Sequence, residues 1–371
     1  MTENLEERAK EAFKAGIENI DREEYDQAVH DFSQAIKLDV TFKNAYYHRG
    51  RAKSLLGDGY GALADFMQVL ELDPTDSDAY IALGLLHQIT DLGAAERDYS
   101  EALKFDPTEG MAYRLRGIIK RKQGRLKEAL ADLDEAAKYD PENPLVYIER
   151  GSVKTMQGEA SQSLPSLAQT KAPSHFKEAI ADFDKAIELD PKNAEAYFNR
   201  ALARARLGDT QRAVRDYFEV IKLDPKNVEA YYNRGTLRIH AGNPQGAIAD
   251  FDKVIELKPE DANAHLQKAY VKAQIGDFDG AISDNTRALE LIPSDDFKLI
   301  EMAYNNRSYA KSRKGDSKGS KEDRSLAFKA QCDNIIPSAR KAAFGNRRAG
   351  MEALMDEFSR DLDEFRKRKG E

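Results

Sequence analysis

Apolar and small residues recur along most of the chain at the three- and four-residue spacing that is typical of amphipathic helices. The segment 228–261 shows this pattern most clearly, with such residues at its fourth and eighth places and again at its twentieth, twenty-fourth and twenty-seventh. Gly242 separates the two groups, and Pro259 follows the second. Glycine favours the turn after a helix, and proline cannot continue one. The segment therefore predicts two short helices joined by a turn.

The same pattern returns at a fixed interval. Seven prolines that end phrases such as Glu-Leu-Asp-Pro are separated by 33, 34, 50, 34, 34 and 34 residues. A period of this size predicts stacked repeats in place of two or three independent domains. The predicted repeats span residues 9–42, 43–76, 77–109, 110–143, 144–193, 194–227, 228–261 and 262–295, with a degenerate ninth at about 301–330.

The interval of 50 residues marks an insertion in the fifth repeat. Residues 159–174 contain two prolines and four serines. This composition favours a mobile loop over regular structure. A loop that regulates the protein or docks a partner is the functional alternative.

The 34-residue frame resembles the tetratricopeptide repeat. The shared features are an aromatic residue near the start, glycine at places 8 and 15, alanine at place 20, an aromatic residue at place 24 and proline at place 32. The resemblance implies an all-α, right-handed superhelical solenoid over residues 1–330, in which each repeat buries its apolar face against its neighbours. It also implies a concave groove, lined by the first helix of each repeat, that binds a segment of another protein.

The end of the chain carries a further apolar pattern. Because a terminal repeat needs a polar outer surface, we expect residues 331–371 to form an amphipathic helix that caps the array. Pairing of this helix with a second copy of the chain is the alternative. The apolar residues that share one helical face are Met351, Leu354, Met355, Phe358, Leu362 and Phe365.

Two places of the first helix are candidates for contacts in the groove. Place 5 is mostly aromatic or aliphatic, which suits the side chains of a bound peptide or helix. Place 6 carries amides in the later repeats, and an amide can both donate to and accept from the backbone of an extended ligand. Solvated surface amides are the alternative at place 6. The candidates are Tyr47, Ile81, Ile148, Phe198, Tyr232 and Leu266 at place 5, and Asn199, Asn233, Gln267 and Asn306 at place 6.

Charged residues repeat as well, with Arg or Lys at place 7 and Asp at place 23 of most repeats. If each cation pairs with the aspartate of the preceding repeat, few aspartates are left without a partner. We therefore predict a structural ladder of ion pairs between repeats, which would be costly to break at one partner. Its predicted pairs are Asp182 with Arg200, Asp216 with Arg234, and Asp250 with Lys268.

Composition narrows the function classes. The 371 residues include 57 basic and 65 acidic side chains, a formal charge of −8 that disfavours a dedicated nucleic-acid binder. The one cysteine, Cys332, cannot form an intramolecular disulfide. The sequence shows neither a membrane-spanning apolar run nor a secretory signal, so a cytoplasmic location is expected.

Catalytic and cofactor motifs are not apparent in the sequence. The six histidines fall in different repeats without metal-ligand spacing, and there is no glycine-rich phosphate loop or nucleophile elbow. We expect a protein that is not an enzyme and needs no cofactor or metal. The Lys and Asn pattern with which some members of the resembled family clamp the carboxylates of chaperone tails is missing, so that partner is disfavoured.

The sequence thus predicts a scaffold or adaptor that binds a peptide or helical segment of a partner, chiefly in repeats 6 to 8. Two alternatives stay open. The first is self-assembly through the C-terminal helix into a homo-oligomer. The second is binding of nucleic acid or acidic lipid by the basic clusters at 311–324 and 366–369, although nearby acidic residues dilute both clusters.

Overall fold

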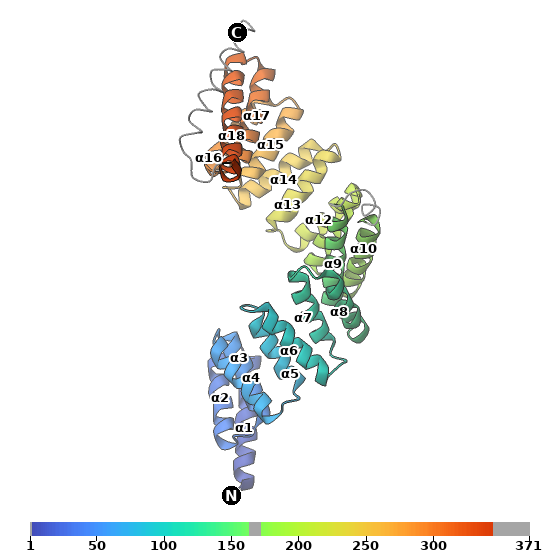
Figure 1. Ribbon diagram of the computed structural model, residues 1–371, viewed down its shortest axis with the longest axis vertical. Coiled ribbons are helices and arrows are strands. Elements are labelled where there is room, and N and C mark those ends of the chain that lie inside the picture. Colours follow the sequence, from blue (N-terminus) through green and yellow to red (C-terminus); the bar gives the residue numbers. More distant parts are fainter. Residues whose placement is uncertain (1, 163–171, 344–371) are drawn as a thin grey trace. The chain divides into compact units, whose positions relative to one another are not determined.

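The computed structural model of the chain describes residues 2–162 and 172–343. Within these ranges the backbone forms eighteen helices and no strand (Figure 1). The chain divides into two compact units, Met1–Asp224 and Pro225–Glu371. The first unit holds α1 to α12 and the second holds α13 to α18, so the prediction of an all-α solenoid is confirmed.

In the first unit the helices form six consecutive pairs, one for each of the first six repeats. Each helix packs against the next one in its pair, and the second helix of a pair packs against the first helix of the following pair. The pairs are α1 (Thr2–Asp21) with α2 (Tyr25–Leu38), α3 (Lys43–Leu55) with α4 (Gly59–Leu72), α5 (Ser77–His87) with α6 (Leu92–Phe105), α7 (Gly110–Lys122) with α8 (Leu126–Tyr139), α9 (Pro144–Gln162) with α10 (Ala172–Leu189), and α11 (Ala194–Arg206) with α12 (Thr210–Leu223).

The second unit holds three more pairs with the same packing. They are α13 (Val228–His240) with α14 (Pro244–Leu257), α15 (Ala262–Gln274) with α16 (Phe278–Leu291), and α17 (Phe297–Lys314) with α18 (Ser317–Ala343).

Eight helix pairs have their connecting turn within the described residues, and in six of these the turn contains a glycine with positive φ, as at the predicted Gly208 and Gly242. Gly208 and Gly242 have φ angles of 81° and 71°, in the left-handed region that L side chains rarely adopt. Asp209 and Asn243 then cap the second helices by accepting hydrogen bonds from backbone N–H groups of Arg212 and Gly246. These local signals explain why the boundaries of the helices follow the sequence frame.

Place 8 is small because an aromatic ring from the second helix lies directly against it. A Cβ atom built on Gly50 would lie 2.8 Å from the ring of Phe66, and one on Gly235 would lie 3.0 Å from that of Phe251. Both rings are buried. The contact of place 8 with place 24 therefore sets how closely the two helices of a repeat approach.

The fifth repeat differs from the sequence prediction. Residues 159–162 continue α9 and residues 172–174 begin α10, so the predicted loop at 159–174 is wrong for both ends; residues 163–171 lie outside the described part. Gly158 lies against Phe176 just as Gly151, seven residues earlier, lies against Phe183, with Cβ-to-ring distances of 2.7 Å in both cases. Seven residues are about two helical turns, so the insertion lengthens both helices by one more packing layer.

The last repeat also continues further than predicted. The helix α18 runs without a break from Ser317 to Ala343, so the predicted boundary at 330/331 falls inside one helix. The apolar run that begins at Met351 lies outside the described residues.

Candidate functional site

The ion pairs join the two helices of one repeat. Arg200 Nη2 lies 2.7 Å from Asp216 Oδ1, and Arg234 Nη2 lies 2.6 Å from Asp250 Oδ1. The predicted pairing of place 7 with the aspartate of the preceding repeat, as in Asp182 with Arg200, is therefore wrong. Places 7 and 23 face each other across the helix pair, which brings them closer than the same places in neighbouring repeats.

Each of these aspartates binds a second cation from place 11, one helical turn beyond place 7. Arg204 Nη1 lies 2.6 Å from Asp216 Oδ2, and Lys154 Nζ lies 2.7 Å from Asp182 Oδ2. In the two repeats that lack a cation at place 7, place 11 still supplies a partner: Asn19 donates to Asp31, which also accepts from Gln27, and His87 Nδ1 lies 2.6 Å from Asp98. The residue at place 11 is thus a partner of the place-23 aspartate that the sequence did not reveal.

The place-7 cations also reach the preceding repeat, at place 25. Arg200 Nη1 lies 2.6 Å from Asp184 Oδ1, and Lys268 Nζ lies 2.8 Å from Asp252 Oδ1. Seven of the nine aspartates at place 23 are buried, whereas Asp184 and Asp252 are about half exposed. These networks hold helices together and leave the face of the first helices free for other contacts.

We call the side of the first helices that carries places 2, 5, 6, 9, 12 and 13 the groove face. In the first unit it contains a cavity of about 440 Å³ between repeats 2, 3 and 4. The structure brings the predicted residues Tyr47 and Ile81 together here, beside Phe66. Leu55 and Met111, which the sequence analysis did not single out, also line the cavity and are 58 % and 39 % exposed. Its remaining lining residues are Arg51, Ser54, Asp78, Ala82, Leu85 and Glu109.

Two other candidates at place 5 belong to the core. Ile148 packs with Tyr147 and Ala186, and Leu266 packs with Ala288 and Ala303. Both side chains are almost fully buried. They are therefore unavailable to a ligand, contrary to the prediction.

The aromatic candidates of the later repeats are half-buried. The Phe198 ring lies 5.5 Å from that of Tyr217, and the Tyr232 ring lies 5.7 Å from that of Phe251, both edge to face. Burial raises the pKa of Tyr232, and the nearby side chain of Gln267 acts in the opposite direction. These rings pack partly within the array and partly toward the groove face.

The amides at place 6 differ in their surroundings. Gln267 is engaged with Tyr232. Asn199, Asn233 and Asn306 are half-buried, and their side chains have no hydrogen-bond partner among the described residues. Asn199 belongs to the first unit and the other amides to the second. A side-chain amide without a partner suits the backbone of an extended ligand, because it can both donate and accept a hydrogen bond.

A second cavity, of about 330 Å³, lies on the groove face of the second unit. It is lined by Tyr270, Ala273 and Gln274 of α15 and by Asn306 and Tyr309 of α17. The two tyrosines are 44 % and 51 % exposed. Only Asn306 was predicted; the tyrosines occupy place 9, where the other repeats follow no single pattern.

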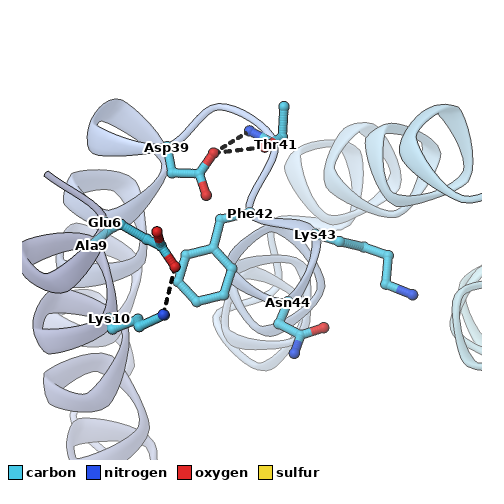
Figure 2. Close-up of a pocket in the computed structure, with 8 residues that line it drawn as sticks. All are labelled: Glu6, Ala9, Lys10, Asp39, Thr41, Phe42, Lys43 and Asn44. Carbon is cyan, nitrogen blue, oxygen red and sulfur yellow. Dashed lines mark hydrogen bonds and ion pairs between the residues drawn. The ribbon is translucent and has the colours of Figure 1, made fainter. Parts of the chain in front are cut away.

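A third cavity lies between α1 and the start of α3 (Figure 2). It measures about 290 Å³, and the ring of Phe42 lies between the polar side chains of the two helices. Lys10 Nζ lies 2.6 Å from Glu6, and Asp39 accepts hydrogen bonds from Thr41. Its polar groups are thus largely paired with each other.

The groove face of repeats 4 and 5 carries an ion pair between the two repeats. Arg121 Nη2 lies 3.1 Å from Glu149 Oε2. Burial raises the pKa of Glu149, while Arg121 and Arg114 act in the opposite direction. Places 12 and 6 of these two repeats are thus paired with each other.

The basic cluster at 311–324 is partly neutralised. Lys311 Nζ lies 2.9 Å from Asp323, Lys314 pairs with Asp279, and Arg313 lies over the ring of Phe278. Residues 366–369 lie outside the described part of the chain. The other cations of the cluster, Lys318, Lys321 and Arg324, are exposed.

Two features are absent from residues 2–162 and 172–343. No helix in these ranges is both long enough and apolar enough to cross a membrane. In the same ranges, no three or more His, Cys, Asp or Glu side chains are grouped so that they could hold a metal ion.

Family models match along most of the array. Models of the tetratricopeptide repeat match residues 44–76, 203–262 and 232–296, and a model of the TPR repeat matches 117–158 and 175–208. Together the matches span more than half of the chain. No curated protein sequence matches it.

Solved structures share the helical-repeat fold. PilF of Pseudomonas aeruginosa is 21% identical over 62% of this chain and 97% of its own, with a TM-score of 0.50. Human IFIT1 is 16% identical over 82% of this chain and 68% of its own, with a TM-score of 0.51. YrrB, described as a TPR protein with an unusual peptide-binding site, is 26% identical over 54% and 95%, with a TM-score of 0.42.

Proposed function

Because the chain belongs to the tetratricopeptide repeat family, we propose that it is a non-enzymatic scaffold or adaptor that binds a peptide or helical segment of a partner protein on its groove face. The observation that carries this proposal is the cavity between repeats 2, 3 and 4, where Tyr47, Ile81 and Leu85 meet. Leu55 and Met111 leave apolar surface open at its edge. The principal anchor therefore lies nearer the N-terminus than the sequence suggested.

The physical basis is burial of an apolar side chain from the partner. Full burial of a Leu, Ile, Met or Phe side chain contributes roughly 1.5–3 kcal/mol. A few such anchors dominate the affinity of most interfaces, whereas the surrounding contacts contribute little. Arg51, Asp78 and Glu109 line the same cavity and supply polar contacts for the residues that flank the anchor.

The amides of the second unit supply a different contact. Asn233 and Asn306 are free to exchange hydrogen bonds with the backbone of an extended segment. Such bonds contribute about 0.5–1.5 kcal/mol each and do not depend on the ligand's side chains. We expect Asn233→Ala with Asn306→Ala to weaken the binding of an extended ligand. Gln245→Ala, which removes an exposed amide on the second helix α14 of the same unit, should leave that binding unchanged.

The experiment begins with selection of peptides from a displayed random library on the full chain. The dissociation constant of a selected synthetic peptide is then measured for wild type and for Leu55→Ser combined with Met111→Ser. Both side chains are partly exposed, so the fold is retained. We expect the dissociation constant to rise at least about tenfold. The control is Tyr60→Ser, because Tyr60 is 90 % exposed and lines none of the described cavities; equal affinities for the double variant and the control would refute the anchor.

One observation favours self-assembly as a second candidate function. At place 28, repeats 1 and 3 carry Ile36 and Leu103, which are buried. Phe328 at the same place of α18 is 50 % exposed. A second copy of the chain would bury this surface. Light scattering would then give a dimer for wild type and a monomer for Phe328→Ser, whereas a monomer in both cases would exclude self-assembly.

A further inference from the structure

The cavities of the two units occupy equivalent positions. The cavity of the first unit is lined by places 9, 12 and 13 of repeat 2, and by places 6 and 9 of repeat 3 among others. The cavity of the second unit is lined by places 9, 12 and 13 of repeat 8 and by places 6 and 9 of repeat 9. The fold thus forms a cavity at the same position in both units, and the two cavities differ in the chemistry of their side chains. We call the cavity of the first unit the first slot and the cavity of the second unit, between repeats 8 and 9, the second slot.

The slot between repeats 8 and 9 has no charged lining residue. Tyr270 and Tyr309 contribute two aromatic rings, and Gln274 and Asn306 contribute two amides. A ligand that enters this slot gains nothing from carrying a charge, because burying a charge without a partner is unfavourable. Charge complementarity therefore selects an uncharged segment.

The two tyrosines differ from the tyrosines of the core. Tyr99 and Tyr217, both at place 24, are almost fully buried, whereas Tyr270 and Tyr309 leave about half of their surface exposed. An exposed ring has an apolar face that a ligand can cover and a hydroxyl that can donate a hydrogen bond. The slot therefore offers flat apolar surfaces together with hydrogen-bond donors.

The deep apolar wall of the first slot has no counterpart here. Phe66, which lines the first slot, is at place 24. The residue at place 24 of repeat 8 is Asn285, which is fully buried and donates to the backbone oxygen of Ala281. The second slot is consequently built for a flat group that stacks on tyrosine, and not for a long aliphatic side chain that needs an apolar floor.

We propose that the slot formed by Tyr270, Gln274, Asn306 and Tyr309 binds a proline-containing, extended segment of a partner protein. A proline ring is flat, apolar and uncharged, and proline-rich segments are already extended before binding. Proline has no backbone N–H, so its segments present mainly carbonyl acceptors. Those acceptors match the donors of the amides and the tyrosine hydroxyls. This inference rests on the proposed function, since it assigns a ligand class to one part of the groove face.

The test uses acetylated, amidated octaproline as the probe and a Gly-Ser octapeptide of equal length as the reference. Binding to the full chain is measured by isothermal titration calorimetry for wild type and for Tyr270→Ser combined with Tyr309→Ser. We expect octaproline to bind wild type more tightly than the Gly-Ser peptide, and the double variant to lose about tenfold in affinity.

Two control variants make the result specific. Tyr60→Ser, in the first unit, is expected to bind octaproline as wild type does. Tyr270→Phe with Tyr309→Phe keeps the rings and removes the hydroxyls, so it is expected to keep part of the affinity. Circular dichroism confirms that each variant retains its helices.

The outcomes separate this inference from the proposed function. If octaproline binds no better than the Gly-Ser peptide while the library-selected peptide still binds through Leu55 and Met111, the ligand class is wrong and the proposed function stands. If octaproline binds equally well to the Tyr270 and Tyr309 double serine variant, the site is wrong. Loss of selected-peptide binding from the first slot has no bearing on either result.

Discussion

At the scale of single residues, the buried aspartates carry the largest electrostatic role in the fold. Asp216 is 3 % exposed and pairs with both Arg200 and Arg204, whose side chains are 13 % and 15 % exposed. Removing a carboxylate from such a site leaves two cations in poor solvent. The contact of Asp216 with Arg200 inside the repeat can therefore be tested separately from the contact of Arg200 with Asp184 of the preceding repeat.

We expect Asp216→Ala to lower the free energy of unfolding by about 3–5 kcal/mol, because a buried partner is lost. Asp184→Ala is the matched variant, since Asp184 contacts the same Arg200 but its side chain is 51 % exposed. It should cost about 1 kcal/mol or less. Denaturant unfolding measures both values, and equal costs would show that the pairing within the repeat is not the dominant contact.

His265 gives a prediction about pH. It takes the place of the tyrosine found at place 4 of neighbouring repeats, such as Tyr231 and Tyr304, and it faces Asp284 and Lys268. Burial lowers the pKa of His265 below its usual value of about 6.5. Below pH 6.5 the unfolded chain therefore binds a proton at this residue that the folded chain does not yet bind.

It follows that the contribution of His265 to stability is present above pH 6.5 and is lost as the pH falls toward its folded pKa. We expect His265→Tyr to reduce the dependence of the unfolding free energy on pH between about 5 and 7. Burial also lowers the pKa of His48, so part of the dependence remains in the variant. A variant whose pH profile runs parallel to that of wild type would rule out this role.

The partners of the aspartates show where prediction from sequence stopped. In a 34-residue frame, place 7 lies sixteen residues before place 23 of its own repeat and sixteen residues after place 25 of the preceding one. The structure uses both contacts, as Arg200 does with Asp216 and Asp184. The sequence prediction considered only place 7 as the partner of the aspartates and overlooked place 11. At that place Asn19 contacts Asp31 and His87 contacts Asp98.

At the scale of elements, the frame predicted the helix pairs well, because glycine turns, capping residues and small residues at place 8 are local signals. The insertion was misjudged, because prolines and serines dominate its composition. Its ends nevertheless carry Gly158 and Phe176 at the spacing that repeats the contact of Gly151 with Phe183. A seven-residue offset between two such pairs is the signal that would have predicted longer helices.

A larger side chain at Gly158 tests whether the extra layer of the fifth repeat, where Gly158 contacts Phe176, is tightly packed. A Cβ atom on Gly158 would lie 2.7 Å from the buried ring of Phe176. We expect Gly158→Val to lower the free energy of unfolding by about 1–3 kcal/mol, because the ring cannot move without disturbing the core. Ala160→Val, on an exposed position of the same helix, should change it by about 0.5 kcal/mol or less. Equal effects in thermal or denaturant unfolding would show that the added layer is not packed.

At the scale of the whole molecule, the net charge of −8 says little about partners, because many charged side chains are committed to networks inside the repeats. The distinguishing features are the uncharged or apolar residues on the groove face of each unit. Sequence alone predicted that face and several of its residues, including Tyr47, Ile81 and Asn306. It could not show that Ile148 and Leu266 are buried, because place 5 is exposed or covered depending on the neighbouring repeat.

The two slots give the molecule two different recognition chemistries. The first unit offers an apolar cavity with charged lining residues, and the second offers tyrosines and amides without charge. A scaffold with two such sites can hold two different segments. The proposed function rests on the first slot, because burial of an apolar side chain from a partner there would supply binding energy.

The most direct test of that claim is a double-mutant cycle between the apolar anchor of the selected peptide and Leu55 with Met111. The four dissociation constants come from the wild-type and Leu55→Ser, Met111→Ser chains, each with the peptide and its anchor-to-alanine form. If the anchor enters the slot, the two changes should be coupled by about 0.5–3 kcal/mol. Strictly additive effects, with no coupling energy, would contradict binding at this slot.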